Sequence, residues 1–154
     1  MEDSFGLERN KPSHHYNIYV IMVGEKRCGD LYDIEFYQNN KGQEPVKDLL
    51  VQLQKSGKTN KECRIRAEKI LTYIRVLEEY GIRAGEPYMK RILGTDLWEL
   101  RPVRDRIFFF TFMNGKIVLL SHFLKKTQKT PKREIERAEK YMKSYMERSE
   151  NNGK

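Results

Sequence analysis

The first regular pattern along the chain is an alternation of apolar and acidic residues just after position 30. Within residues 31–37, Tyr32, Ile34 and Phe36 alternate with carboxylates, and a period of two is typical of a strand with one buried face. The polar run 39–42 that follows is typical of a turn. We therefore predict a strand over residues 31–37.

Two helical patterns come next. Pro45 suits the first position of a helix, and the apolar residues after it predict a short amphipathic helix that ends at Ser56. Thr59 and Glu62 have the spacing of a capping box, and they predict a second, longer helix that runs to Gly81. The apolar positions of this second helix recur at intervals of three and four: Cys63, Ala67, Ile70, Ile74 and Leu77.

From position 88 onward the pattern changes to strands. Asn114-Gly115 is a strong signal for a two-residue hairpin loop, and Thr130-Pro131 opens a final amphipathic helix. This order of elements predicts one α+β domain, an antiparallel sheet of four to five strands with a two-helix hairpin on one face and a C-terminal helix. The strands after the hairpin of helices are predicted over 88–93, 97–101, 106–113 and 116–123.

The composition narrows the class of protein. A chain of 154 residues fits one domain. With 34% charged residues and no apolar run of membrane-spanning length, no membrane partner is predicted. The net charge is +8, and residues 101–154 hold 14 basic against 6 acidic residues, which accounts for the whole excess. A polyanionic partner is therefore expected to bind the last third of the chain.

The cysteines and histidines predict neither a disulfide framework nor a metal site. Cys28 and Cys63 fit no metal-ligand spacing with the three histidines, so neither a metal nor a cofactor is predicted. The apolar stretch 16–23 has no cleavage site of the kind that follows a secretory signal. These features together predict a reduced, cytoplasmic protein.

The predicted hairpin fixes which residues face each other across the last two strands. With Asn114 and Gly115 as the loop, His122 lies opposite Ile107, on the other face from Arg106. We interpret His122 as a histidine at the edge of the hairpin, although a role as acid or base stays open. Three further pairs are predicted: Phe110 with Leu119, Phe108 with Ser121, and Arg106 with Phe123.

This register gathers cations at one end of the sheet. A four-residue loop over 102–105 would place Arg101 opposite Arg106, on the face shared by Glu99 and Lys125. Directly opposed like charges are destabilising, so their convergence suggests an anion site, and guanidinium groups suit a phosphate. The alternative is that each cation is a solvated residue at a strand end.

Several motifs occur in a fixed order along the chain. They are Leu97-Trp98-Glu99-Leu100-Arg101, Arg106-Ile107-Phe108-Phe109, Phe123-Leu124-Lys125-Lys126-Thr127-Gln128-Lys129-Thr130-Pro131 and a last helix with Ala138. With the strand at 31–37 and Pro45, this order resembles the HigB-like, phage-derived branch of the RelE/ParE toxin superfamily over about residues 31–146. The resemblance implies a RelE-like, microbial-ribonuclease-like fold. We divide the chain into an N-terminal extension (1–30), a toxin domain (31–148) and a flexible tail (149–154).

The resemblance also implies the toxin of a type II toxin–antitoxin pair. The usual activity that the resemblance implies is that of an endoribonuclease that cleaves mRNA, commonly on the ribosome. A helix-turn-helix antitoxin (HigA-like), encoded beside the toxin, is the implied inhibitor. In this hypothesis the 2′-hydroxyl attacks the phosphate without a metal ion. Arg101 and Arg106 hold the phosphate, Lys125 or Lys126 assists the leaving oxygen, and Glu99 is the candidate base. The residues expected to contact the RNA backbone are Lys90, Arg104, Lys129 and Lys132.

Two other classes of function stay open. The first is a noncatalytic module that poisons DNA gyrase, as ParE-type relatives do, or merely binds nucleic acid. The second is an interaction protein that has lost its activity and keeps the same fold. Ser121 stands where family members often have histidine, and His122 follows one place later, which leaves the inactive alternative open. Arg106 and the Lys125-Lys126 pair favour the nuclease, because a gyrase poison needs no phosphate-cleaving cluster.

Overall fold

The structure is a computed structural model that describes residues 31–153, and the predicted extension at 1–30 lies outside the described residues. In the described range the elements follow the predicted order. The strands are β1 (Asp33–Phe36), β2 (Met89–Arg91), β3 (Trp98–Leu100), β4 (Asp105–Phe112) and β5 (Lys116–Leu124). The helices are α2 (Pro45–Ser56), α3 (Lys61–Tyr80) and α4 (Lys132–Asn152), with short 3₁₀ turns η3 (Gly81–Ala84) and η4 (Met113–Gly115). The predicted α+β class is confirmed.

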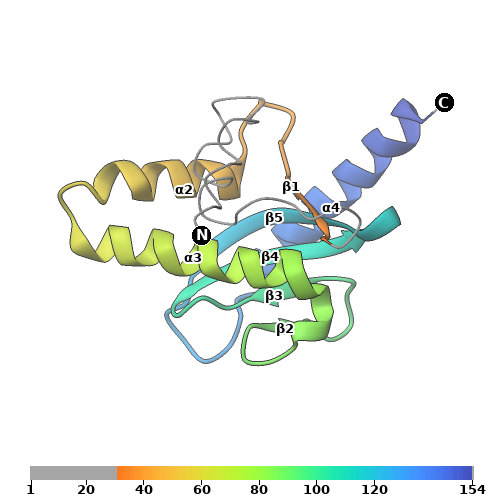
Figure 1. Cartoon of the computed structure of the whole chain (residues 1–154). Coiled ribbons are helices and arrows are strands. Elements are labelled where there is room, and N and C mark those ends of the chain that lie inside the picture. Colours follow the sequence, from red (N-terminus) through yellow and green to blue (C-terminus); the bar gives the residue numbers. More distant parts are fainter. Residues whose placement is uncertain (1–30, 154) are drawn as a thin grey trace.

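The strands of the described part form one mixed sheet in the order β1-β5-β4-β3-β2 (Figure 1). β2 to β5 are antiparallel neighbours, as predicted, but β1 pairs in parallel with β5, with Asp33 opposite Lys116. The sheet is therefore not purely antiparallel. Two helices separate β1 from the later strands, and a connection of that length allows a parallel pairing that a tight hairpin could not form.

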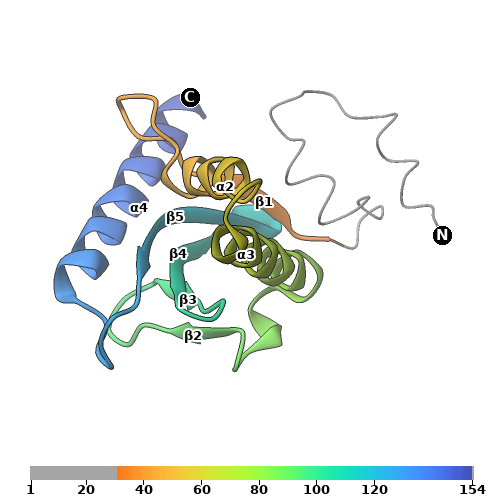
Figure 2. The ribbon, with the colours of Figure 1, turned by 90° about the vertical axis from the view of Figure 1, so that its left-hand side faces the viewer.

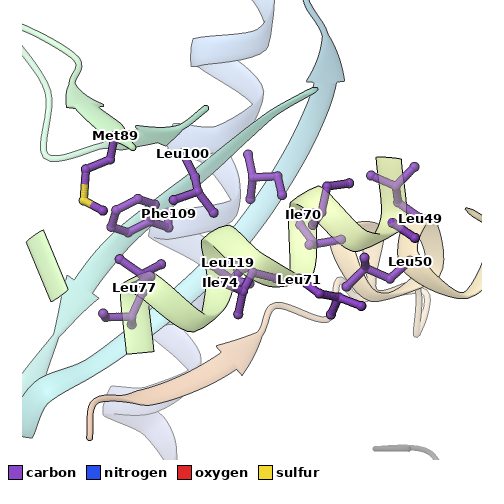
Figure 3. Close-up of a cluster of buried hydrophobic side chains, with 14 of the residues drawn as sticks. Leu49, Leu50, Ile70, Leu71, Ile74, Leu77, Met89, Leu100, Phe109 and Leu119 are labelled. Carbon is purple, nitrogen blue, oxygen red and sulfur yellow. The ribbon is translucent and has the colours of Figure 1, made fainter. Parts of the chain in front are cut away.

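The sheet lies between α4 on one face and the α2–α3 pair on the other (Figure 2). Figure 3 shows the side chains of α2 and α3 packed over the strands that carry Leu100, Phe109 and Leu119. On the opposite face, Phe108 and Leu120 pack against Ala138 of α4. The central strands are thus covered on both sides and form the core of the domain. No helix between residues 31 and 153 has the length and apolar character to cross a bilayer.

Two helix ends differ from the predictions. The side chain of Asn60, rather than Thr59, caps α3 by accepting a hydrogen bond of 3.1 Å from the Cys63 N–H. α4 continues to Asn152, so residues 149–152, which we assigned to the C-terminal tail, are helical. A helix continues until a residue interrupts it, and here the first glycine after the predicted boundary is Gly153.

The β4–β5 hairpin differs from the prediction at its tip and agrees with it at its base. The turn has three residues, so Phe112 and not Met113 faces Lys116, and Phe110 faces Val118 instead of Leu119. A β-bulge at Leu120 then shifts the register by one residue. Beyond the bulge the predicted pairs are confirmed: Phe108 with Ser121, Ile107 with His122, and Arg106 with Phe123.

Gly81 ends α3 in a conformation that requires glycine, with φ of 63° and ψ of −152°. A Cβ there would lie 2.6 Å from the Tyr32 ring. We predict that Gly81→Ala lowers the free energy of unfolding by about 3 kcal/mol through strain and overlap. Gly94→Ala is the control, because Gly94 also has a positive φ but no atom within 4 Å of its Cβ position; it should cost about 1 kcal/mol. Urea unfolding measures both values. Equal losses of unfolding free energy in the two variants would contradict the role of the Tyr32 contact.

Candidate functional site

A buried carboxylate, Glu99 of β3, lies at the centre of the candidate site and is 2% exposed. Its Oε1 atom lies 3.6 Å from Nε of Arg101 and 3.9 Å from Nε of Arg106. Its Oε2 atom accepts a hydrogen bond of 3.1 Å from the Thr130 hydroxyl. A charge is costly to bury unless it is paired, so these contacts compensate for the removal of Glu99 from water.

The strand register explains why these groups meet. Glu99 pairs with Phe108 and Leu100 pairs with Ile107, so Arg101 and Arg106 flank the loop between β3 and β4. Side chains two residues apart on a strand share a face, which places Arg106 on the same face as Phe108 and Glu99. The structure thus brings together three of the predicted catalytic residues.

Arg106 is held by the loop that precedes it. Its Nη1 atom donates hydrogen bonds to the backbone oxygens of Val103, at 2.8 Å, and Asp105, at 2.9 Å. The residue is 7% exposed, and this burial lowers the pKa of its guanidinium from the usual value, with Glu99 opposing the shift and Arg101 adding to it. An arginine stays protonated in proteins despite such shifts, so Arg106 supplies a fixed, poorly hydrated positive charge.

The two predicted catalytic lysines lie in the connection between β5 and α4. The Lys125 ammonium donates a hydrogen bond of 2.8 Å to the Gln128 backbone oxygen, so it points into its own loop and not to Glu99. Lys126 is exposed, and among residues 31–153 its ammonium forms no hydrogen bond or ion pair. Lys126 is therefore the more accessible of the two.

The predicted RNA-contacting residues are all exposed but do not lie together. Lys90 of β2 pairs directly with Glu99 and therefore shares its face of the sheet. Lys129 lies in the β5–α4 connection next to Thr130, and Lys132 begins α4. Arg104 instead lines a groove beside α3, which places it apart from the other three.

Two contacts of the site were not predicted from sequence. Asp105 pairs with Arg66 of α3, whose Nη2 and Nε atoms donate hydrogen bonds of 2.7 and 3.0 Å to its carboxylate. This hydrogen bonding raises the pKa of Arg66. No pattern in the sequence indicates the second contact, the hydrogen bond from Thr130 to Glu99. The side of the sheet that Asp105 faces was predictable from the sequence. Neighbouring residues of a strand point to opposite faces, so Asp105 faces away from Arg106 and toward α3.

His122 lies on the α3 face, opposite Ile107, as predicted. Its backbone oxygen accepts a hydrogen bond of 3.3 Å from Arg137, and burial lowers the pKa of its imidazole. The sheet therefore separates His122 from Glu99 and the two arginines. In the part of the chain that the structure describes, no group of three or more His, Cys, Asp or Glu residues could hold a metal ion.

A comparison with known protein families finds a match over most of the folded part of the chain. A family model described as phage-derived protein Gp49-like (DUF891) matches residues 49–143. This range covers α3, β2 to β5 and all the predicted site residues. No curated protein matches the chain.

The partly buried imidazole of His122 gives a prediction about stability and pH. Because burial lowers its pKa, the unfolded chain takes up a proton at this position more readily than the folded chain. The contribution of His122 to the free energy of unfolding is therefore fully present above the ordinary histidine pKa of about 6.5. It is lost as the pH falls below that value. We expect His122→Gln to reduce the loss of unfolding free energy between about pH 7.5 and 5. Urea unfolding across this range checks it, and an unchanged slope would contradict it.

Proposed function

Because the chain belongs to the Gp49-like family of phage-derived proteins, we propose that it is the toxin of a type II toxin–antitoxin pair and cleaves messenger RNA in the cytoplasm. The family is compatible with such a toxin. The mixed sheet between a helical hairpin and a last helix supports a RelE-like assignment. The proposed partners are mRNA on the ribosome and a cognate, HigA-like antitoxin with a helix-turn-helix domain.

The observation that carries this proposal is the pair of guanidinium groups held around the buried Glu99. Cleavage of RNA through its 2′-hydroxyl places extra negative charge on a pentacoordinate phosphate, and fixed cations stabilise that charge. Arg101 is partly exposed and would contact a phosphate oxygen directly. Arg106 lies deeper and strengthens the positive field where water is largely excluded. A noncatalytic gyrase poison has no need of this arrangement.

In the proposed reaction the 2′-oxygen attacks the adjacent phosphorus and the bond to the 5′-oxygen breaks. The proton of the 2′-hydroxyl leaves to water, and Lys126 gives a proton to the departing 5′-oxygen. Lys125, whose ammonium binds the Gln128 carbonyl, keeps this loop in place. The cations of the chain supply the charge stabilisation, so the proposal includes no metal ion or cofactor.

We assign Glu99 the role of a positioning residue rather than that of the base. Its carboxylate is 2% exposed, and both of its oxygens already have partners in Arg101, Arg106 and Thr130. A base must reach the proton that it removes, whereas a buried and fully paired carboxylate is suited to orient its neighbours.

Binding to the RNA backbone is assigned to cations around this cluster. Lys90 shares the face of Glu99, and Lys129 and Lys132 flank Thr130. Each phosphate contact releases counterions, so affinity should fall steeply as salt rises. Arg104, on the rim of the groove beside α3, would contribute at most a peripheral contact.

Replacing Arg106 tests the proposed function. We expect Arg106→Ala to reduce RNA cleavage by roughly 10²–10³-fold, the usual effect of losing one fixed donor to a developing negative charge. Growth arrest after induction of the protein in cells should disappear together with RNA cleavage. Mapping new RNA 5′ ends after induction measures the cleavage. Arg75→Ala is the control, because Arg75 is an exposed arginine on α3 and should leave the cuts unchanged.

The fold of the Arg106 variant is checked by circular dichroism. Arg101 and Thr130 still contact Glu99 in this variant, so the fold should persist, and Arg106→Lys provides a second test that keeps the charge but loses the planar fork. Undiminished cleavage in both folded variants would reject the catalytic role. Growth arrest with intact RNA would favour a gyrase poison instead.

The role of Glu99 gives a separate prediction. If Glu99 positions the arginines, Glu99→Gln should lower the cleavage rate by about tenfold and leave the shape of the pH–rate profile unchanged. Glutamine keeps an oxygen that can accept from Thr130 but loses the charge. Loss of roughly 10²–10⁴-fold together with loss of the acidic limb of the profile would show that Glu99 is the base.

A further inference from the structure

A groove of about 460 Å³ lies on the α3 side of the sheet, between the first half of α3 and the loop 102–105. Three of its side chains are apolar and exposed: Ile65 at 44%, Val103 at 63% and Leu124 at 37%. Apolar side chains scattered singly on a surface are ordinary, but a group of them that lines one groove is typical of a binding site. We call this feature the α3 groove.

Val103 is the most informative residue of the α3 groove. It has a φ of 58°, a conformation that is unusual for any residue with a Cβ and a genuine outlier for a β-branched one. Glycine or asparagine would suit this turn better. The side chain is mostly exposed, so packing within the described fold does not explain a valine here.

The rim of the α3 groove is basic. Lys61, Lys69 and Arg104 are exposed along it, against Glu62 as the exposed acid. Asp105 also lines the groove, but Arg66 neutralises it through two hydrogen bonds. The groove thus combines an apolar centre with a positive border, and an occupant must supply apolar side chains flanked by acidic ones.

We propose that the α3 groove is the docking site of the antitoxin, which inserts an acidic, amphipathic segment with its apolar side chains against Ile65, Val103 and Leu124. The identity of this partner rests on the proposed toxin function. The basic rim attracts the acidic residues of the segment, and the apolar centre supplies affinity by burial. RNA is the less suitable occupant, because the lining of the α3 groove includes no aromatic ring on which a base could stack.

The test measures two affinities of the full chain. The first is for the protein encoded by the neighbouring reading frame, by calorimetry, and the second is for a labelled single-stranded RNA oligonucleotide, by anisotropy. Val103→Asn removes the apolar anchor and suits the positive φ, so its Tm should be unchanged or higher by roughly 2–4 °C. Ile65→Ser removes a second anchor from an exposed helix face. Val51→Asn, at an exposed valine of α2, is the matched control.

We expect Val103→Asn and Ile65→Ser each to weaken binding of the neighbouring protein by about tenfold or more. The control should bind the partner normally, and both Ile65→Ser and the control should bind RNA as the unchanged chain does. Unchanged binding of the partner by the folded variants would overturn the proposal. The proposal would also be overturned if the variants lost affinity for RNA instead of for the partner. It would be overturned as well if the unchanged chain did not bind the neighbouring protein.

The same preparations separate this proposal from the proposed nuclease function. Weaker partner binding in the variants together with no RNA cleavage by the unchanged chain would leave the α3 groove as a docking site and reject the nuclease. Normal cleavage together with unaffected partner binding would reject the docking site and leave the nuclease.

Discussion

The burial of one carboxylate, Glu99, is the constraint on which the candidate site depends. A charge removed from water must be paired, or the fold loses several kcal/mol. Its partners come from the end of β3, the start of β4 and the connection between β5 and α4. Satisfying Glu99 therefore fixes three segments relative to one another and brings two guanidinium groups to one point. The positive charge at the site is thus a consequence of burying the Glu99 carboxylate together with its two arginine partners.

The β-bulge at Leu120 decides which side chains reach that site. The three-residue turn at the tip sets a register that, continued along β5, would place His122 opposite Arg106. The extra residue at Leu120 restores Phe123 to that position and keeps His122 on the other face. A simple hairpin with a two-residue loop gives the same pairing at the base. The sequence-based register was therefore right near Arg106 although it missed both irregularities, because their shifts cancel.

Much of the fold and part of the site follow from local patterns. Periodicity placed the strands and helices, and strand register alone predicted that Arg101, Arg106 and Glu99 would meet. The direction of β1 in the sheet and the partners of several charged side chains did not follow from these patterns. The parallel pairing of β1 depends on how the helical hairpin crosses the sheet. The pairing of Asp105 with Arg66 depends on packing between distant elements. The turn of Lys125 toward the Gln128 carbonyl depends on the backbone conformation of its own loop. Strand alternation indicates that Asp105 faces away from Arg106, but no spacing in the sequence identifies Arg66 as its partner.

Residues 102–105, which lead from β3 into the first residue of β4, link the two faces of the sheet. Asp105 and Arg106 are neighbours in sequence, yet alternation along β4 sends one side chain to α3 and the other to Glu99. The guanidinium of Arg106 is in turn held by the backbone oxygens of Val103 and Asp105. A partner that contacts Val103 therefore touches the same loop that orients Arg106. Inhibition of the proposed nuclease can in this way begin on the α3 face without covering the arginines, since a small shift of the loop would misplace a fixed charge.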